Sequence, residues 1–253
     1  VLFRSESVAR AAPDGLSILQ TDNNWYLTNT FLRTNLSYNL EKDLTPAIML
    51  VFAKNILVAS TEFPAKSLQE IFALAKQKPG AYNFGSFGIG AINHIDTEAM
   101  ADLAGVKFTH IPYKGGAPLL QALMTHEIHF TLAGMTAAIP LIRQGRIRAL
   151  AYGGLTRSPL FPDLPTLSEA GLKGFESSAW FAWAVHAATP RDVVDKIYND
   201  TARVLATPEV REKFVLAPGH EPASLPGSKV IEYLAAEKPN FAARIKPLNL
   251  KLE

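Results

Sequence analysis

The sequence predicts an α/β protein in which helices flank a mostly parallel sheet. From about residue 67 to residue 152, short apolar runs of strand length alternate with amphipathic segments of helix length. That alternation is typical of βαβ units. Of the 253 residues, 48% are hydrophobic and 19% are charged, so the chain can bury a sizeable core and lies far from the composition of disordered proteins. The length allows one large domain or two small ones.

Each expected element has a local signal. The expected strands are short apolar runs, many of them rich in β-branched residues, at 16–20, 47–52, 56–59, 82–85, 107–111, 128–132, 147–152 and 180–185. Ser67-Leu68-Gln69-Glu70 has the spacing of a capping box, and Pro79-Gly80 ends the helix that it opens. The other expected helices have periodic apolar faces or Pro at the first turn, at 6–12, 91–104, 117–124, 136–144, after Thr189, after Thr207 and at 226–241.

The composition argues against several classes of protein. The 25 basic and 23 acidic residues give a net charge of +2, and no run of Lys or Arg exceeds two neighbours, so we expect no nucleic-acid partner. The absence of cysteine rules out disulfides, thiolate metal sites and cysteine nucleophiles. No stretch approaches the ~20 apolar residues of a membrane span.

Two glycine-rich turns carry most of the functional information. Residues 82–90 (YNFGSFGIG) and 110–118 (HIPYKGGAP) each resemble a strand that runs through a Gly-rich turn into a helix. Such turns leave main-chain N–H groups uncovered at the positive end of a helix dipole, where a small anion can bind. The expected ligand-binding residues, taken from these turns, the turn at 134–137 and the polar loop at 21–24, are Ser86, Gly88, Ile89, Gly90, Tyr113, Gly115, Thr136 and Asn24.

Other interpretations of these motifs are weaker. Gly88-Ile89-Gly90 would need a further glycine at Asn93 to bind a dinucleotide, and Phe84 stands where a hydrolase nucleophile elbow has glycine. Residues 126–129 (HEIH) space their histidines three apart, not the four of a zinc hydrolase, so we expect no metal and no cofactor. The alternative of ordinary βα turns stays open. The polar residues of segment 94–98, His94, Asp96 and Glu98, are interpreted as surface residues of a helix.

Five ordered motifs resemble one known family. They are residues 9–15 (ARAAPDG), 64–68 (PAKSL), 111–115 (IPYKG), 145–151 (GRIRALA) and 161–171 (FPDLPTLSEAG). Together they resemble the Bug-type solute-binding receptors of tripartite tricarboxylate transporters. The resemblance implies a two-lobed, type II periplasmic-binding-protein-like fold and a periplasmic, monomeric receptor that is not an enzyme. It further implies that the lobes close on a small carboxylate in an interdomain cleft and deliver it to a membrane permease, and that main-chain N–H groups grip the carboxylate.

The resemblance also sets expectations for the domains and the ligand. Lobe one is expected at 1–60 plus 187–253, and lobe two at 61–186. Val1–Ser5 can be encoded by the end of a common sequencing adapter, so we expect the native sequence to begin near Glu6, with the family's first strand, its Pro-Gly-Gly loop and a signal peptide before it. The polar pair common after the third strand of lobe two is here Ala133-Gly134, which suggests an aromatic acid or a longer diacid. A small-ester hydrolase and a fragment that binds nothing remain the alternatives.

Overall fold

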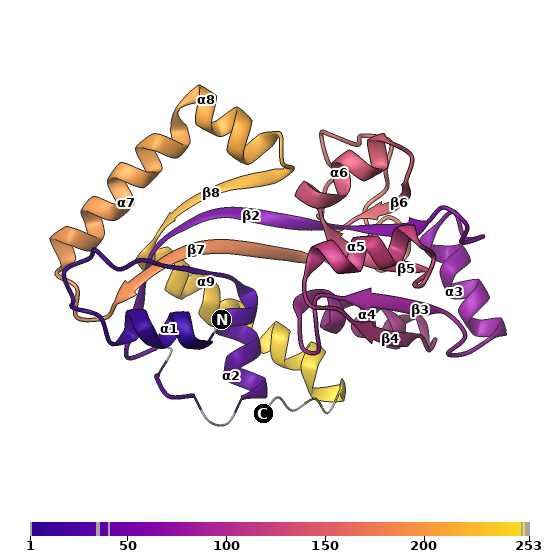
Figure 1. Cartoon of the computed structure of the whole chain (residues 1–253), viewed down its shortest axis with the longest axis horizontal. Helices are drawn as coiled ribbons and strands as arrows, with labels where there is room; N and C mark the ends of the chain where they lie inside the picture. The colour runs from indigo at the N-terminus through magenta and orange to yellow at the C-terminus, as the bar shows by residue number, and fades with distance from the viewer. Residues whose placement is uncertain (1, 34–35, 40, 249, 251–253) are drawn as a thin grey trace. The chain divides into compact units, whose positions relative to one another are not determined.

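The computed structural model describes residues 2–33, 36–39, 41–248 and 250, with only the backbone described for Leu2, Phe3, Asn24 and Trp25 (Figure 1). The chain forms two compact units. Unit 1 comprises Val1–Phe52 and Ala179–Glu253, and unit 2 comprises Ala53–Ser178. The chain thus passes from unit 1 to unit 2 within the strand Leu44–Ser60, and returns to unit 1 at the start of the strand Ser178–His186.

Unit 2 is built on a mixed sheet. Its strands are the second half of β2 (Leu44–Ser60), β3 (Asn83–Ser86), β4 (Thr109–Pro112), β5 (Phe130–Gly134) and β6 (Ile147–Tyr152). Strand β3 pairs in parallel with β4 and with β5, whereas β2 runs antiparallel to β5 and to β6. The helices between these strands are α3 (Leu68–Gln77), α4 (Ile92–Ala104), α5 (Gly116–Met124) and α6 (Met135–Arg143).

Both faces of this sheet are buried. Along β2, Leu57 packs with α3 and α4 in one apolar cluster, while its neighbours Ile56 and Val58 pack with α5 and α6 in another. Successive side chains of a strand point to opposite faces. A strand covered on both faces must therefore be apolar at consecutive positions, which explains the unbroken apolar run of β2.

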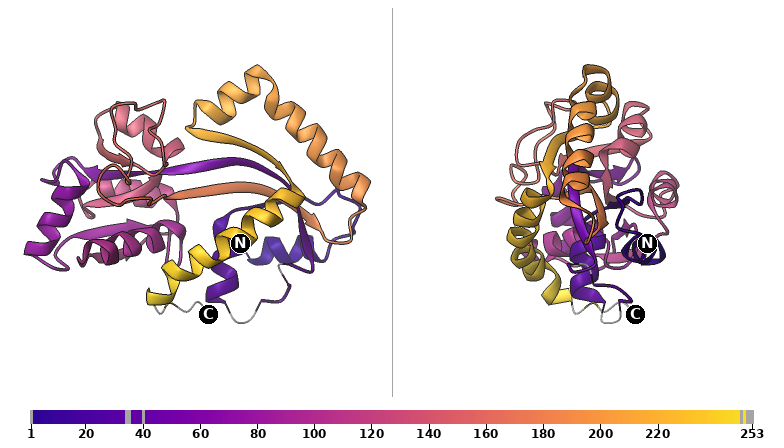
Figure 2. Two further views of the ribbon diagram at one scale, coloured as in Figure 1. Left: turned by 180° about the vertical axis from the view of Figure 1, so that it is seen from behind. Right: turned by 90° about the vertical axis from the view of Figure 1, so that its left-hand side faces the viewer.

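Unit 1 surrounds the first half of β2. Strand β1 (Leu19–Thr21) pairs antiparallel with β7 (Ser178–His186), and β8 (His220–Pro226) pairs with β2. Figure 2 shows β8, β2 and β7 side by side from behind. The helices are α1 (Leu2–Ala9), the π-helical turn η1 (Asn24–Thr28) with α2 (Asn29–Leu32), α7 (Arg191–Ala206), α8 (Pro208–Val210) with the π-helical turn η2 (Arg211–Leu216), and α9 (Gly227–Ile245) with the 3₁₀ turn η3 (Lys246–Leu248).

The core of unit 1 joins strands that are far apart in the sequence. Met49 of β2, Trp180 and Ala182 of β7, and Val230 and Leu234 of α9 form one buried cluster. Because β7 and α9 follow unit 2 in the chain, this core requires both segments of unit 1.

The structure differs from the sequence-based elements in several places. The apolar runs at 47–52 and 56–59 belong to one strand of 17 residues, β2. The strand expected at 16–20 begins at Leu19, and the side chain of Leu16 is 87% exposed. Strand β8 was not expected, because Pro222 and Pro226 remove backbone donors and weaken the strand signal.

The boundaries between the two units lie between Phe52 and Ala53 and between Ser178 and Ala179. The sequence placed the change from lobe to lobe later in both strands, after residues 60 and 186. The sequence-based boundaries assign residues 53–60 to lobe one and residues 179–186 to lobe two. They describe the lobes expected to close on a ligand, and they stay a prediction.

Candidate ligand-binding site

Three helices of unit 2 begin at the same edge of the sheet. Strands β3, β4 and β5 run in the same direction, and Ser86 at the end of β3 lies opposite Pro112 at the end of β4. Helices α4, α5 and α6 each follow one of these strands. Their N-termini therefore face the edge formed by the carboxyl ends of the strands, where ligands bind in open α/β sheets.

None of these three helices has a side-chain cap. The residues that precede them, Ala91, Gly115 and Gly134, make no capping hydrogen bond. Helix α3 of the same unit is different, because the Ser67 hydroxyl accepts from the Glu70 N–H at 3.2 Å. Uncapped first-turn N–H groups carry partial positive charge. The edge thus offers donors and a positive potential to an anion.

The turn from Ser86 to Gly90 is held by hydrogen bonds of its own. Gly88 and Gly90 have φ angles of 136° and 77°, which favour glycine. The Gly88 N–H donates to the Ser86 hydroxyl at 3.1 Å, and the Gly90 N–H donates to Nδ1 of His94 at 3.0 Å. The expectation that both glycines leave their N–H groups uncovered is therefore wrong. The N–H of Ile89 donates to no residue that the structure describes, and its side chain is 53% exposed.

Ser86 is the first residue of the turn. Its side chain is completely buried, and its hydroxyl lies 2.9 Å from the Gly88 carbonyl oxygen and 2.6 Å from Nε2 of His110. The imidazoles of His110 and His94 are stacked, with ring centroids 3.8 Å apart and an angle of 11° between their planes. Whether Ser86 contacts a ligand stays a prediction.

The interpretation of His94 and Asp96 as surface residues is wrong. His94 is 4% exposed and Asp96 is completely buried, while Glu98 is partly buried. Asp96 accepts a hydrogen bond from Ser177, which comes much later in the chain. The periodicity of α4 could not reveal a partner supplied by another segment.

Both stacked histidines are neutral at neutral pH. Burial lowers the pKa of His94 to about 4, with a smaller contribution from the neighbouring His110. Burial also lowers the pKa of His110 to about 4. These rings therefore accept or donate hydrogen bonds at the turn without adding positive charge.

The remaining expected residues are placed as follows. The Tyr113 hydroxyl donates to Glu127 at 2.8 Å, and burial together with this bond raises the pKa of Tyr113 well above its usual value. Gly115, before α5, has a φ of 104° and open space around it. Thr136 is exposed in the first turn of α6. The side chain of Asn24 lies outside the described part of the chain.

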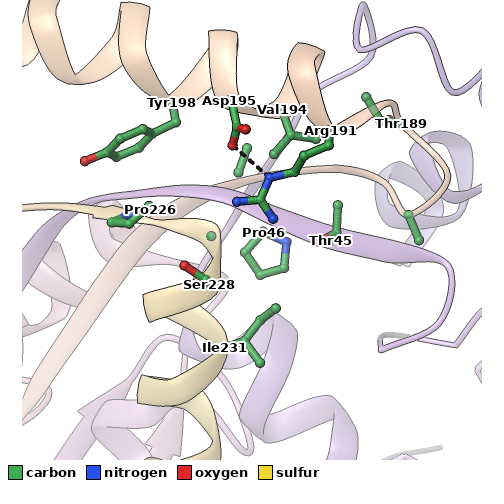
Figure 3. Close-up of a pocket in the computed structure, with 13 residues that line it drawn as sticks. Thr45, Pro46, Thr189, Arg191, Val194, Asp195, Tyr198, Pro226, Ser228 and Ile231 are labelled. Atoms are coloured by element: carbon green, nitrogen blue, oxygen red, sulfur yellow. Dashed lines mark hydrogen bonds and ion pairs between the residues drawn. The ribbon is translucent and has the colours of Figure 1, made fainter.

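A separate pocket lies within unit 1 (Figure 3). Its volume is about 280 Å³, and its lining includes the start of α7, the start of α9 and Pro46 of β2. The Arg191 guanidinium donates to Asp195 at 2.9 Å, so the positive charge at this pocket is already paired. None of the residues expected from the sequence to bind a ligand lines it.

Among the residues that the structure describes, no group of three His, Asp or Glu side chains gathers in a way that could hold a metal ion. Among the described helices, none combines the length and the apolar character that a membrane crossing requires.

An α/β chain in two units, with several helix N-termini at one sheet edge, has the architecture of the type II periplasmic binding proteins. The chain belongs to the tripartite tricarboxylate transporter family receptors, since the model of that family, TctC, matches residues 2–250. The resemblance to this family and the α/β fold expected from the sequence are both confirmed.

Curated relatives agree with this assignment. A UPF0065 protein of Bordetella pertussis is 33% identical over 217 residues, covering 86% of this chain and 67% of the relative. Protein BugT of the same organism is 27% identical over 250 residues, covering 98% of this chain and 76% of BugT. Against a further relative, from Pseudomonas sp. strain P51, the chain spans 63% of the relative's length.

Solved structures agree as well. A protein of R. palustris solved with adipate is 28% identical, with a TM-score of 0.91 over 97% of this chain and 82% of that one. The periplasmic binding protein BugD is 28% identical, with a TM-score of 0.88 over 100% of this chain and 84% of BugD. MatC of Rhodopseudomonas palustris, solved with malate, is 26% identical, with a TM-score of 0.84 over 96% of this chain and 84% of MatC.

Proposed function

We propose that this protein is a periplasmic receptor that binds a small organic carboxylate and delivers it to the membrane permease of a tripartite transporter. The observation that carries the proposal is the edge of unit 2 where α4, α5 and α6 begin without side-chain caps. Carboxylate oxygens accept hydrogen bonds from main-chain N–H groups, and the helix dipoles favour the negative charge. Family members solved with adipate and with malate support this class of ligand.

Several features of the proposal follow from family membership. The protein would be directed to the periplasm by a signal peptide, act as a monomer and bind no nucleic acid. The interdomain cleft in which the resemblance places the ligand also stays a prediction. Ligand binding would favour a closed state through its higher affinity for that state.

We propose that the ligand-binding residues lie in the turns that lead into α4, α5 and α6, together with Asn24. Ile89 offers an N–H group without a partner in the described chain, and Gly115 and Thr136 lie at the starts of α5 and α6. Tyr113 lies between β4 and α5, and its hydroxyl would contact a carboxylate by donating to it in place of Glu127. Ser86, Gly88 and Gly90 shape the turn that carries Ile89. Asn24, from unit 1, remains part of the proposal on sequence grounds.

The structure offers one observation in favour of the hydrolase alternative. The Ser86 hydroxyl oxygen lies 2.6 Å from Nε2 of His110, a distance at which a nucleophile and its general base are hydrogen-bonded. The Ser86 side chain is nevertheless completely buried, so a substrate carbonyl could not reach it without opening the turn. Turnover of a p-nitrophenyl ester that is abolished in a Ser86→Ala variant would support the hydrolase and contradict the receptor.

A panel of ligands tests the receptor directly. Thermal unfolding should be followed with adipate, malate, benzoate and acetate. A ligand at a hundred times its Kd stabilises a protein by about 2.7 kcal/mol, which gives a shift of several degrees at this size. Because Ala133-Gly134 leaves out a polar pair, adipate or benzoate is expected to bind more tightly than malate. Cooperative unfolding without a shift for any acid would contradict the proposal.

The variant Gly134→Val tests the location of the site. Gly134 has φ −67° and ψ 135°, which valine adopts readily, and no atom lies within 4 Å of a Cβ placed there. The substitution therefore covers the start of α6 without crowding the protein. We expect at least a tenfold loss of affinity with an unchanged unfolding temperature, and a smaller loss in the matched Gly134→Ala variant. Unchanged affinity in Gly134→Val would place the ligand elsewhere.

A further inference from the structure

We propose that His94 and His110 are positioning residues that hold the turn from Ser86 to Gly90 in the shape that presents the Ile89 N–H to the ligand. This inference rests on the proposed function, and it assigns a role to two residues that do not themselves touch the ligand. Its basis is a set of contacts within unit 2.

His94 fixes the end of the turn. The Gly90 N–H donates to Nδ1 of His94 at 3.0 Å, so Nδ1 carries no proton and the neutral ring must carry its proton on Nε2. That Nε2 lies 3.9 Å from Oε1 of Glu98, one turn along α4. His94 is 4% exposed, so the packing around the residue restricts the position of its ring.

His110 fixes the start of the turn. Its Nε2 lies 2.6 Å from the Ser86 hydroxyl, which also accepts the Gly88 N–H. The His110 ring also packs against Phe84, with centroids 4.9 Å apart, and the Phe84 centroid lies 6.2 Å from that of His94. Phe84 of β3, His110 of β4 and His94 of α4 thus form a cluster of three rings, with each histidine bonded to one end of the turn.

The third N–H group of the turn, that of Ile89, is available to a ligand. The N–H groups of Gly88 and Gly90 are occupied, whereas the N–H of Ile89 between them has no partner in the described chain, and the Ile89 side chain is 53% exposed. If Gly90 lost its acceptor, the turn could rotate and direct Ile89 elsewhere. Preorganised donors bind more tightly because the cost of ordering them has been met in folding.

The arrangement requires a neutral His94 ring. Burial lowers the pKa of each ring to about 4, and Nδ1 of a protonated His94 would become a donor facing the Gly90 N–H. The titratable groups near His94 are His110, which stacks on it, and Glu98, which has Asp102 as its own neighbour. Burial raises the pKa of Glu98, with a smaller contribution from Asp102, so Glu98 does not stabilise a charged ring strongly.

The experiment compares two substitutions of nearly equal size. In His94→Asn, the amide oxygen can occupy the position of Nδ1 and accept from Gly90, whereas His94→Leu offers no acceptor there. Isothermal titration of wild type and both variants with adipate, malate and benzoate should give about a tenfold loss of affinity in His94→Leu, the usual worth of one hydrogen bond. The His94→Asn variant should recover most of that loss. Amide exchange of Gly90 in the empty protein should be faster in His94→Leu than in His94→Asn.

The outcomes separate the two proposals. Equal affinity in all three proteins, or an equal loss in both variants, would overturn the positioning role and leave the receptor function intact. Binding of none of the three acids by the wild-type protein would overturn the receptor function, and the positioning role with it. If His94→Leu does not fold, the pair His110→Gln and His110→Met gives the same comparison at Nε2, with the loss expected in His110→Met.

Discussion

The Ser177 hydroxyl donates a hydrogen bond of 2.7 Å to the carboxylate of Asp96, and both side chains are completely buried. The same hydroxyl accepts from the Asn55 side-chain amide at 2.9 Å. One serine therefore links strand β2, helix α4 and the start of β7 within unit 2. A buried carboxylate requires such partners, because the loss of hydration is costly.

The variant Ser177→Ala should be strongly destabilised. It removes one partner from both Asp96 and Asn55 and leaves their polar atoms in a buried site, so we expect a loss of about 2 kcal/mol in the free energy of unfolding. Urea unfolding measures this loss. The control is Ser168→Ala, in which an exposed hydrogen bond to Gly174 is lost and the effect should be below about 0.5 kcal/mol. Equal effects in the two variants would contradict the role given to Ser177.

A methyl group at Gly153 should be poorly tolerated. A Cβ there would lie 2.4 Å from the Ser177 carbonyl oxygen and 2.7 Å from that of Asn55, and both are backbone atoms that can move little. We expect Gly153→Ala to lower the free energy of unfolding by about 3 kcal/mol. The Gly134→Ala variant adds the same methyl group in open space and should be neutral or slightly stabilised. Chemical denaturation of both variants checks the difference, and a stable Gly153→Ala protein would contradict the close approach.

Stability should fall as the pH is lowered from 6.5 towards 4. The pKa of His94 is lowered from 6.5 to about 4 in the folded protein, so between these values the unfolded chain binds a proton that the folded chain does not. The folded state is therefore favoured fully above pH 6.5 and progressively less below it, by about 2 kcal/mol after allowance for solvent screening.

Urea unfolding at intervals from pH 4.5 to pH 7.5 measures this slope, and His94→Asn should flatten it. His110, whose pKa is lowered in the same direction, should preserve part of the slope in that variant. A wild-type profile without any slope in this range would show that the rings are not buried in their neutral form.

The capping box at the start of α3 should be worth about 1 kcal/mol. Ser67 accepts from the Glu70 N–H at 3.2 Å, and the Glu70 carboxylate accepts from the Lys66 N–H at 2.7 Å. We expect Ser67→Ala to lower the free energy of unfolding by that amount and Ser67→Asp to retain it, since aspartate is an equally good cap. Denaturant titration of both variants decides this, and an equal loss in both would exclude capping as the cause.

Local signals in the sequence predicted the elements of unit 2 well. The capping box at Ser67 and the alternation of apolar runs describe α3 and the strands that follow, because each signal lies within the element that it defines. The glycine turn at 86–90 was also found, since its unusual backbone angles require glycine. The convergence of α4, α5 and α6 at one edge could be anticipated from the parallel order of their strands.

Interactions between distant segments could not be predicted in the same way. His94 and Asp96 were interpreted as surface residues because the periodicity of α4 does not show that His110 and Ser177 cover it. The hydrogen bonds that occupy Gly88 and Gly90 depend on the same fold-level contacts. A buried polar side chain can be recognised in a sequence only when its partner is near in the chain, and here the partners are not.

The order in which the two units are encoded has a consequence for biosynthesis. Unit 2 is a single continuous stretch, Ala53–Ser178, whereas unit 1 needs both Val1–Phe52 and Ala179–Glu253. As the chain emerges, N-terminus first, into the compartment where it folds, unit 2 is complete before the second part of unit 1 has arrived, and domains generally fold as units. Met49 then has no core to pack into until Trp180 and Val230 are present. Chains truncated after Ser178 should therefore contain a folded unit 2 beside an N-terminal segment that is exposed to chaperones and proteases.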